Sequence, residues 1–153
     1  MNYWLMKSEP DTYSIDDLAA QPRRTDHWDG IRNYQARNFM RDEMKKGDLA
    51  FFYHSNCSEP GIVGIMEIVG EAYPDFTAWE PDSPYYDPKS SAEQPRWYMV
   101  DVKFKRKLGR VITLKELKQH SELSSMRLLQ RGNRLSIMPV SDEEWQFILS
   151  LAR

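Results

Sequence analysis

The chain is organised around a run of apolar residues, Leu49-Ala50-Phe51-Phe52-Tyr53-His54, in which every position before the histidine is apolar. Side chains on a strand point alternately to its two faces, so this run predicts a strand that is covered on both sides. The turn residues Ser58-Glu59-Pro60-Gly61 follow, and Ile62–Val69 then predicts a second strand. Gly64 inside that strand is typical of a bulge or a tight bend in a small barrel.

Further elements are predicted on both sides of this pair. Alternating or apolar runs predict strands over Asn2–Lys7, Arg96–Lys105 and Arg134–Val140. Helical spacing and capping signals predict helices over Ile15–Ala20 and Asn33–Met44, after Thr113, over Ser125–Gln130, and after Ser141. We therefore expect one α+β domain over residues 1–153, with about five to six strands curled into a small barrel and helices packed outside.

Composition excludes several classes of protein. The chain has 153 residues, of which 41% are apolar and 29% charged, and no stretch is apolar enough to span a membrane. No secretory signal is visible at the N-terminus, and the single cysteine, Cys57, excludes an intrachain disulfide. These features predict a globular protein of a reducing, cytoplasmic compartment.

The charge distribution limits the kind of partner that we expect. The formal net charge is −2, which argues against binding through bulk attraction to phosphate. A basic run nevertheless lies between Arg96 and Arg110, directly after an acidic stretch. If a nucleic acid binds, we expect a small footprint and a pocket rather than a broad cationic face.

Two tryptophans lie in segments rich in turn residues. Trp28 precedes Asp29-Gly30, and Trp79 precedes Glu80-Pro81-Asp82. A large flat side chain on a loop usually covers the core, a partner or a ligand. The two therefore predict walls that stack on a planar group, with Tyr85 or Tyr86 as alternatives to Trp79.

Around Trp28 the sequence is dense in groups that recognise a base and its phosphates. Asn33 has an amide that can pair with a base edge, and Arg32 and Arg37 carry guanidinium groups suited to phosphate. The other interpretation is a loop followed by an amphipathic helix with a solvated polar face. For Trp28 and Asn33 the two interpretations weigh about equally.

Catalytic signals are sparse. His54 could act as a base and Cys57 as a nucleophile, but a lone cysteine is more often a small buried side chain. No metal-binding spacing of histidines and cysteines and no glycine-rich phosphate loop occurs. We predict no catalytic residue, no metal and no cofactor, and we expect His54 and Ser55 to line a pocket as hydrogen-bonding groups.

Several motifs together resemble the EVE domain. They are Lys7-Ser8-Glu9-Pro10, Trp28–Asn38, Phe52-Tyr53-His54-Ser55, Pro60–Gly64, Pro95-Arg96-Trp97 with Val100-Asp101-Val102, and Arg134-Leu135-Ser136. The resemblance runs from about Trp4 to the C-terminus. It implies a PUA-like pseudo-barrel, kinship with YTH domains, and recognition of modified cytosine, such as 5-methylcytosine, or another modified base in DNA or RNA.

The resemblance also assigns roles by position. It implies a base-binding pocket, or aromatic cage, made of Ser8, Trp28, Asn33, His54, Ser55 and Trp79. We expect contacts to phosphates or backbone from Lys7, Arg32, Tyr34, Arg37 and Arg134. The resulting hypothesis is a non-enzymatic reader of a single-stranded or flipped modified base, with no membrane partner and with unknown protein partners. The alternatives are an enzyme acting on a nucleotide or RNA through His54 or Cys57, and a peptide-binding module.

Overall fold

The central apolar run forms a strand, β3 (Leu49–His54), with both faces covered, as predicted. In the computed structural model, which describes residues 1–152, Ala50 and Phe52 join one hydrophobic cluster. Phe51 and Tyr53 join a second cluster on the opposite face. The two-residue alternation of a strand thus divides the core into two parts.

Seven strands make up the sheet around β3. They are β1 (Tyr3–Ser8), β2 (Thr25–Trp28), β3, β4 (Gly61–Ile68), β5 (Tyr73–Pro74), β6 (Tyr98–Thr113) and β7 (Ile137–Val140). The order is β2-β6-β4-β3-β1-β7, with β5 paired to β6 outside this path. β1 and β3 are parallel and every other pair is antiparallel. This mixed sheet is the pseudo-barrel of the predicted α+β fold.

Helices cover both faces. They are α1 (Ile15–Ala19), α2 (Tyr34–Asn38), α3 (Leu114–Leu117) and α4 (Asp142–Leu151). Short 3-10 turns form at Pro22–Arg24, Phe76–Trp79, Ser121–Leu123 and Arg127–Leu129, and a π-helical turn at Phe39–Glu43. α1 and α2 contribute to the first cluster, and α3 and α4 to the second. Capping explains two of the helix starts, because the predicted N-caps Ser14 and Ser141 each form a complete capping box, which the sequence predicts for Ser141.

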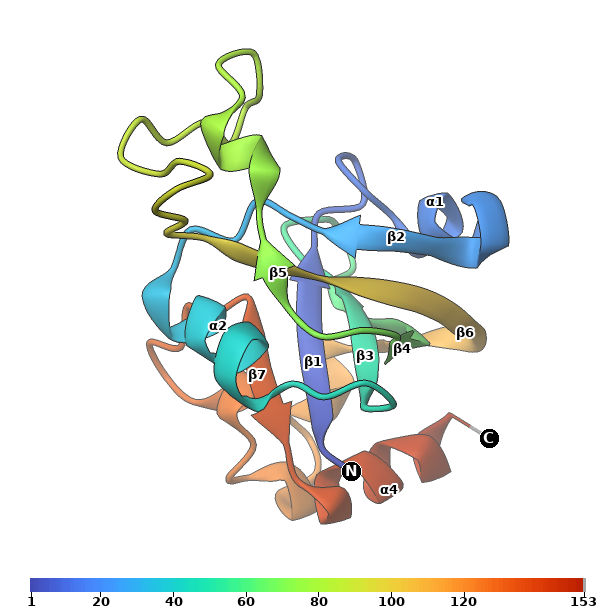
Figure 1. Cartoon of the computed structure of the whole chain (residues 1–153). Coiled ribbons are helices and arrows are strands. Elements are labelled where there is room, and N and C mark those ends of the chain that lie inside the picture. The colour runs from blue at the N-terminus through green and yellow to red at the C-terminus, as the bar shows by residue number, and fades with distance from the viewer. Residues whose placement is uncertain (153) are drawn as a thin grey trace.

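The edge strand β2 lies near the tip of β1 in Figure 1, whereas the other edge strand, β7, runs alongside β1 over Tyr3–Met6. No ladder joins β2 to β7 within residues 1–152, so the barrel stays open along this seam. The long segment between β5 and β6 projects beyond the sheet on the upper left of Figure 1. Gly64 lies where the pairing of β4 with both neighbours shifts register, which confirms the predicted bulge.

Several predicted boundaries were wrong. Thr25–Trp28, expected in a loop, is strand β2, because it pairs with β6 over Val100–Lys103. β6 continues to Thr113 rather than ending at Lys105, and β7 begins at Ile137 rather than Arg134. No helix among residues 1–152 has the length and apolarity needed to cross a bilayer.

Candidate functional site

A cavity of about 630 Å³ lies at the open seam of the barrel. The end of β1, strand β2 and the segment before β7 all contribute to it, and the long β5–β6 segment adds one residue. Its lining consists of Lys7, Ser8, Glu9, Thr12, Tyr13, Asp26, His27, Trp28, Asp29, Gly30, Ile31, Ser55, Tyr85, Arg134, Leu135 and Ser136. The place where the sheet fails to close is therefore the place where a small molecule or a single base fits.

Trp28 joins the cavity to the core. It is the last residue of β2, its side chain is only 7% exposed, and its ring packs edge-on against Phe52 at 5.3 Å. The pairing of Trp28 with Val100 fixes the backbone at this point. The indole is thus held rigidly, which suits a stacking surface because little conformational freedom is lost when a ligand binds.

A chain of hydrogen bonds fixes the polar side of the cavity. The Ser8 hydroxyl donates to the Tyr13 carbonyl oxygen at 2.6 Å, and the Tyr13 hydroxyl donates to Asp26 Oδ2 at 2.7 Å. Burial, and then the hydrogen bond to Asp26, raise the pKa of Tyr13, so this hydroxyl stays a donor. Because the proton of Ser8 is already used, its Oγ can only accept a hydrogen bond from a ligand.

The carboxylate of Asp29 has fewer hydrogen-bond and ion-pair partners within the protein than those of Asp26 and Asp75. Its Oδ2 lies 3.4 Å from His27 Nε2, and His27 Nδ1 lies 3.4 Å from Asp26 Oδ1. Among residues 1–152 no side chain other than His27 is within ion-pair or hydrogen-bond distance of the Asp29 carboxylate. Burial is the largest cause that raises the pKa of Asp29, followed by the nearby charge of Asp75, while His27 opposes the shift.

Tyr85 forms the aromatic wall supplied by the long β5–β6 segment. Gly30 has a φ of +77°, and a Cβ at this position would come within 2.7 Å of the Tyr85 ring. Burial, and next the charge of Asp29, raise the pKa of the Tyr85 hydroxyl. The ring therefore rests directly on the Gly30 backbone, with Asp29 nearby.

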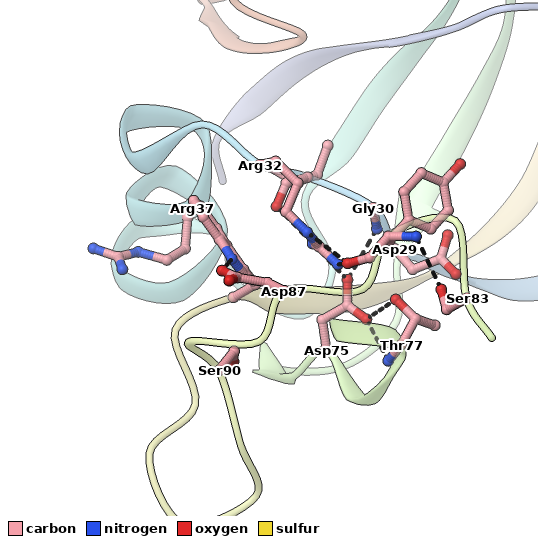
Figure 2. Close-up of polar contacts among 12 residues, drawn as sticks. Asp29, Gly30, Arg32, Arg37, Asp75, Thr77, Ser83, Asp87 and Ser90 are labelled. Carbon is pink, nitrogen blue, oxygen red and sulfur yellow. Dashed lines mark hydrogen bonds and ion pairs between the residues drawn. The ribbon is translucent and has the colours of Figure 1, made fainter. Parts of the chain in front are cut away.

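A buried carboxylate ties the long segment to the turn after β2. Asp75 is fully buried, and its Oδ2 accepts from the Gly30 N–H at 2.9 Å and from Arg32 Nη1 at 3.2 Å. Figure 2 shows Asp75 reaching from the long segment toward Gly30 and Arg32, with its other oxygen directed to Thr77. Arg32 also donates to the Tyr85 carbonyl oxygen from Nε at 3.1 Å and from Nη2 at 2.6 Å. This network positions the cavity wall.

Five of the residues predicted from sequence line the cavity. Ser8, Trp28 and Ser55 come from the predicted pocket, and Lys7 and Arg134 from the predicted phosphate contacts. Lys7 is half-buried, with Nζ 5.7 Å from the centre of the Tyr53 ring, and burial lowers its pKa. Arg134 is exposed at the rim.

Three predicted pocket residues lie elsewhere. Asn33 is the N-cap of α2, where its side chain accepts from the Ala36 N–H at 2.9 Å. His54 Nε2 accepts from the Ile15 N–H at 3.1 Å and thereby ties β3 to the start of α1. Trp79 ends the 3-10 turn Phe76–Trp79 and is absent from the cavity lining, whereas Tyr85 is present. For Asn33 and His54, a hydrogen bond from a backbone N–H uses the side chain for structure.

The remaining predicted phosphate contacts are also engaged within the chain. Arg32 is held by Asp75 and the Tyr85 carbonyl, as described above. Arg37 Nη1 donates to the Arg96 carbonyl oxygen at 3.0 Å, and its guanidinium lies 4.6 Å from the centre of the Tyr34 ring. Tyr34 in turn stacks on Trp97 at 4.7 Å. Arg37 and Tyr34 thus brace α2 against the residues just before β6. None of Arg32, Tyr34 and Arg37 lines the cavity.

Sequence reasoning missed the roles of Tyr13, Asp26, His27 and Asp29. Tyr13 gave no signal because it enters the site through the turn after Pro10. The other three lie beside Trp28, within the segment already singled out, and the pairing of β2 with β6 explains why they gather. The nucleophile pair of the enzyme alternative, His54 and Cys57, does not line the cavity. Among residues 1–152 no cluster of three or more metal-binding side chains occurs.

Comparison with known proteins places this chain in a family. The model of the EVE domain family matches residues 2–151. Thymocyte nuclear protein 1 of Mus musculus is 54% identical over 167 residues, covering 98% of this chain and 73% of that protein. The crystal structure of human THYN1 protein in complex with 5-methylcytosine-containing DNA has a TM-score of 0.95 and 51% identity, covering 100% of this chain and 98% of that one. A crystal structure of a Pseudomonas putida protein has a TM-score of 0.94 and 50% identity, covering 99% of both chains.

Proposed function

The chain belongs to the EVE domain family, and from that premise we propose that it binds nucleic acid without catalysis and reads a modified base. The base enters the cavity at the open seam between β1, β2 and the segment before β7. The observation that carries the proposal is a cavity of about 630 Å³ lined by two aromatic side chains, Trp28 and Tyr85, beside a row of polar groups. The human relative bound to 5-methylcytosine-containing DNA supports the same class of ligand.

The dimensions of the site favour one extruded base over a stretch of duplex. A base inside a helix cannot reach a recessed cavity, so it must be flipped out or offered on a single strand. Trp28 and Tyr85 supply stacking surfaces, and base–aromatic stacking contributes about 1–3 kcal/mol per base. Flipping costs a few kcal/mol, so we expect single strands to bind more tightly than intact duplex.

Few positive charges surround the opening of the cavity, and their number determines how steeply affinity should fall with salt. Lys7 and Arg134 are the cationic side chains of the lining, and the formal net charge of the chain is −2. Affinity that rests on two phosphate contacts falls only about 25-fold per tenfold increase in salt, since each contact on a single strand contributes a slope of about 0.7. A shallow dependence is therefore the signature of this mode of binding.

Affinity measurements on matched oligomers test the proposal. Short DNA and RNA strands carrying one 5-methylcytosine, or one cytosine at the same position, are titrated against the protein by fluorescence anisotropy. Tyr85→Ala removes one wall of the cavity, while Tyr86→Ala removes an adjacent ring that is 45% exposed and outside the lining. We expect a preference for the modified strand that is lost in Tyr85→Ala and kept in Tyr86→Ala. Equal affinity for modified and unmodified strands would refute the proposal, and nuclease-resistant capture of a peptide partner through the cavity would replace it.

A further inference from the structure

The structure carries one inference about specificity, which rests on the proposed function: we propose that Asp29 selects an amino-bearing pyrimidine by accepting a hydrogen bond from its exocyclic amine. The ligand class is then a 5-substituted cytosine, and thymine, which carries the same methyl group, is rejected. The bonds that hold the turn after β2 join Gly30 and Arg32 to Asp75, and the Asp29 carboxylate takes no part in them.

The location of Asp29 supports this role. It lines the cavity immediately after Trp28, and it lies beside Gly30 (Figure 2). The Tyr85 ring rests on Gly30. A base stacked on Trp28 or Tyr85 therefore presents its edge within reach of this carboxylate. Ser8, on the β1 side, can also only accept, because its proton goes to the Tyr13 carbonyl.

The missing partner of Asp29 is a hydrogen-bond donor. The other acids at this end of the barrel are well supplied: Asp75 accepts from Gly30, Arg32 and Thr77, and Asp26 accepts from Tyr13 and from the His27 N–H. The Asp29 side chain keeps 29% of its surface accessible, and among residues 1–152 the His27 ring is the one side-chain group at ion-pair distance from it, at 3.4 Å. Partial burial raises its pKa, which means that the ionised carboxylate is under-solvated there. A donor brought by the ligand relieves that penalty.

The group at position 4 distinguishes 5-methylcytosine from thymine, the two pyrimidines that carry a methyl group at position 5. 5-Methylcytosine carries an amine at position 4, whose N–H groups donate to a carboxylate. Thymine carries a carbonyl oxygen at position 4, whose lone pairs face the carboxylate and repel it. A site that hydrogen-bonds one substituent discriminates strongly against an analogue that lacks it, because the buried polar group is then left unpaired.

The test uses one oligomer sequence in three forms, with cytosine, 5-methylcytosine or thymine at a single position. Wild-type protein, Asp29→Asn and Asp11→Asn are titrated with each form. The asparagine amide can accept from an amine or donate to a carbonyl, so it removes the repulsion of thymine while keeping the shape of the side chain. Asp11→Asn removes the same charge from an exposed position outside the cavity lining, and so controls for the general effect of charge on DNA affinity.

We expect wild type and Asp11→Asn to prefer 5-methylcytosine over thymine by about tenfold or more, and Asp29→Asn to lose most of that preference. Equal wild-type affinity for 5-methylcytosine and thymine, both above cytosine, would overturn the role of Asp29 while leaving the reader function intact. A preference over thymine that Asp29→Asn retains would also overturn it. Equal affinity for all three strands would refute the proposed function and this inference together. The wild-type comparison needs no variant, so it can overturn the role of Asp29 even if Asp29→Asn fails to fold.

Discussion

The ring of Tyr85 lies so close to the backbone of Gly30 that a Cβ at position 30 would come within 2.7 Å of it. This contact joins the turn after β2 to the long segment between β5 and β6, 55 residues later in the chain. It fixes the distance between the aromatic wall and the polar groups of the cavity. The glycine also has a φ of +77°, which L side chains rarely adopt, so position 30 is constrained twice.

Gly30→Ala should therefore weaken binding of the modified oligomer several-fold and lower the free energy of unfolding by about 1–2 kcal/mol, the cost of a left-handed alanine. The loss of affinity follows because the methyl group displaces Tyr85, and the loss of stability follows from the positive φ. Anisotropy titration and urea unfolding measure them. Gly109→Ala is the matched control, since its Cβ would meet no atom within 4 Å. Unchanged affinity in Gly30→Ala would show that the position of Tyr85 does not matter for binding.

Removing the charge of Arg32 should change stability but not the salt dependence of affinity, and removing the charge of Arg134 should do the reverse. Arg32→Gln breaks an ion pair with the fully buried Asp75, so it should lower the free energy of unfolding by about 3 kcal/mol or more. It should not change how steeply affinity falls with salt. Arg134→Gln should leave stability unchanged and reduce the slope of log affinity against log salt by about 0.7. Salt titrations of both variants, beside urea unfolding, check this, and a reduced slope in Arg32→Gln would restore it as a phosphate contact.

Replacing Trp28 and replacing Trp79 should have different effects on stability and binding. Trp28→Ala removes a side chain that is only 7% exposed and packs on Phe52, so it should lower the free energy of unfolding by about 3–5 kcal/mol. Trp79 does not line the cavity, and Trp79→Ala should keep the preference for the modified strand. Binding assays on Trp79→Ala decide the second point. Loss of that preference in a folded Trp79→Ala protein would contradict the assignment of the aromatic wall to Tyr85.

Stability should depend on pH through His54. Its Nε2 accepts from the Ile15 N–H, and burial lowers its pKa below the usual value of about 6.5. Below that pH the unfolded state binds more protons than the folded state, so stability is full above about pH 6.5 and falls as pH decreases toward the folded pKa. His54→Gln keeps an uncharged acceptor and should remove this part of the loss. Urea unfolding of both proteins between pH 8 and pH 5 measures the difference, and parallel curves would rule out a contribution from His54.

The parts of the fold that were predicted correctly depend on local information. The apolar run before His54 and the N-caps at Ser14 and Ser141 specify their elements within a few residues. Strand β2 was missed because Thr25-Asp26-His27-Trp28 has the composition of a turn and becomes a strand only by pairing with β6. The second half of β6 was missed for a similar reason, since its basic run resembles a solvated turn and is extended by its pairing with β4.

The same division holds for the site. The end of β1 and the neighbourhood of Trp28 were found because their motifs are contiguous in sequence. Asn33 had a local signal that favoured structure, since asparagine before a helix is a preferred cap. The structural role of Arg32 could not be predicted from neighbouring residues, because its partner Asp75 lies 43 residues away. The choice of Tyr85 over Trp79 likewise depends on how the long segment folds back onto Gly30.

The most direct test of a base held in the cavity is an NMR measurement on a single-stranded oligomer whose 5-methylcytosine carries a ¹³C-labelled methyl group. If the base enters between Trp28 and Tyr85, the methyl resonance should shift strongly upfield on binding and show NOEs to the aromatic protons of both rings. The Tyr85→Ala protein should lose the Tyr85 contacts and much of the shift. A methyl resonance that stays at its free position in a saturated complex would contradict the account, because the oligomer would then bind without placing its modified base in the cavity.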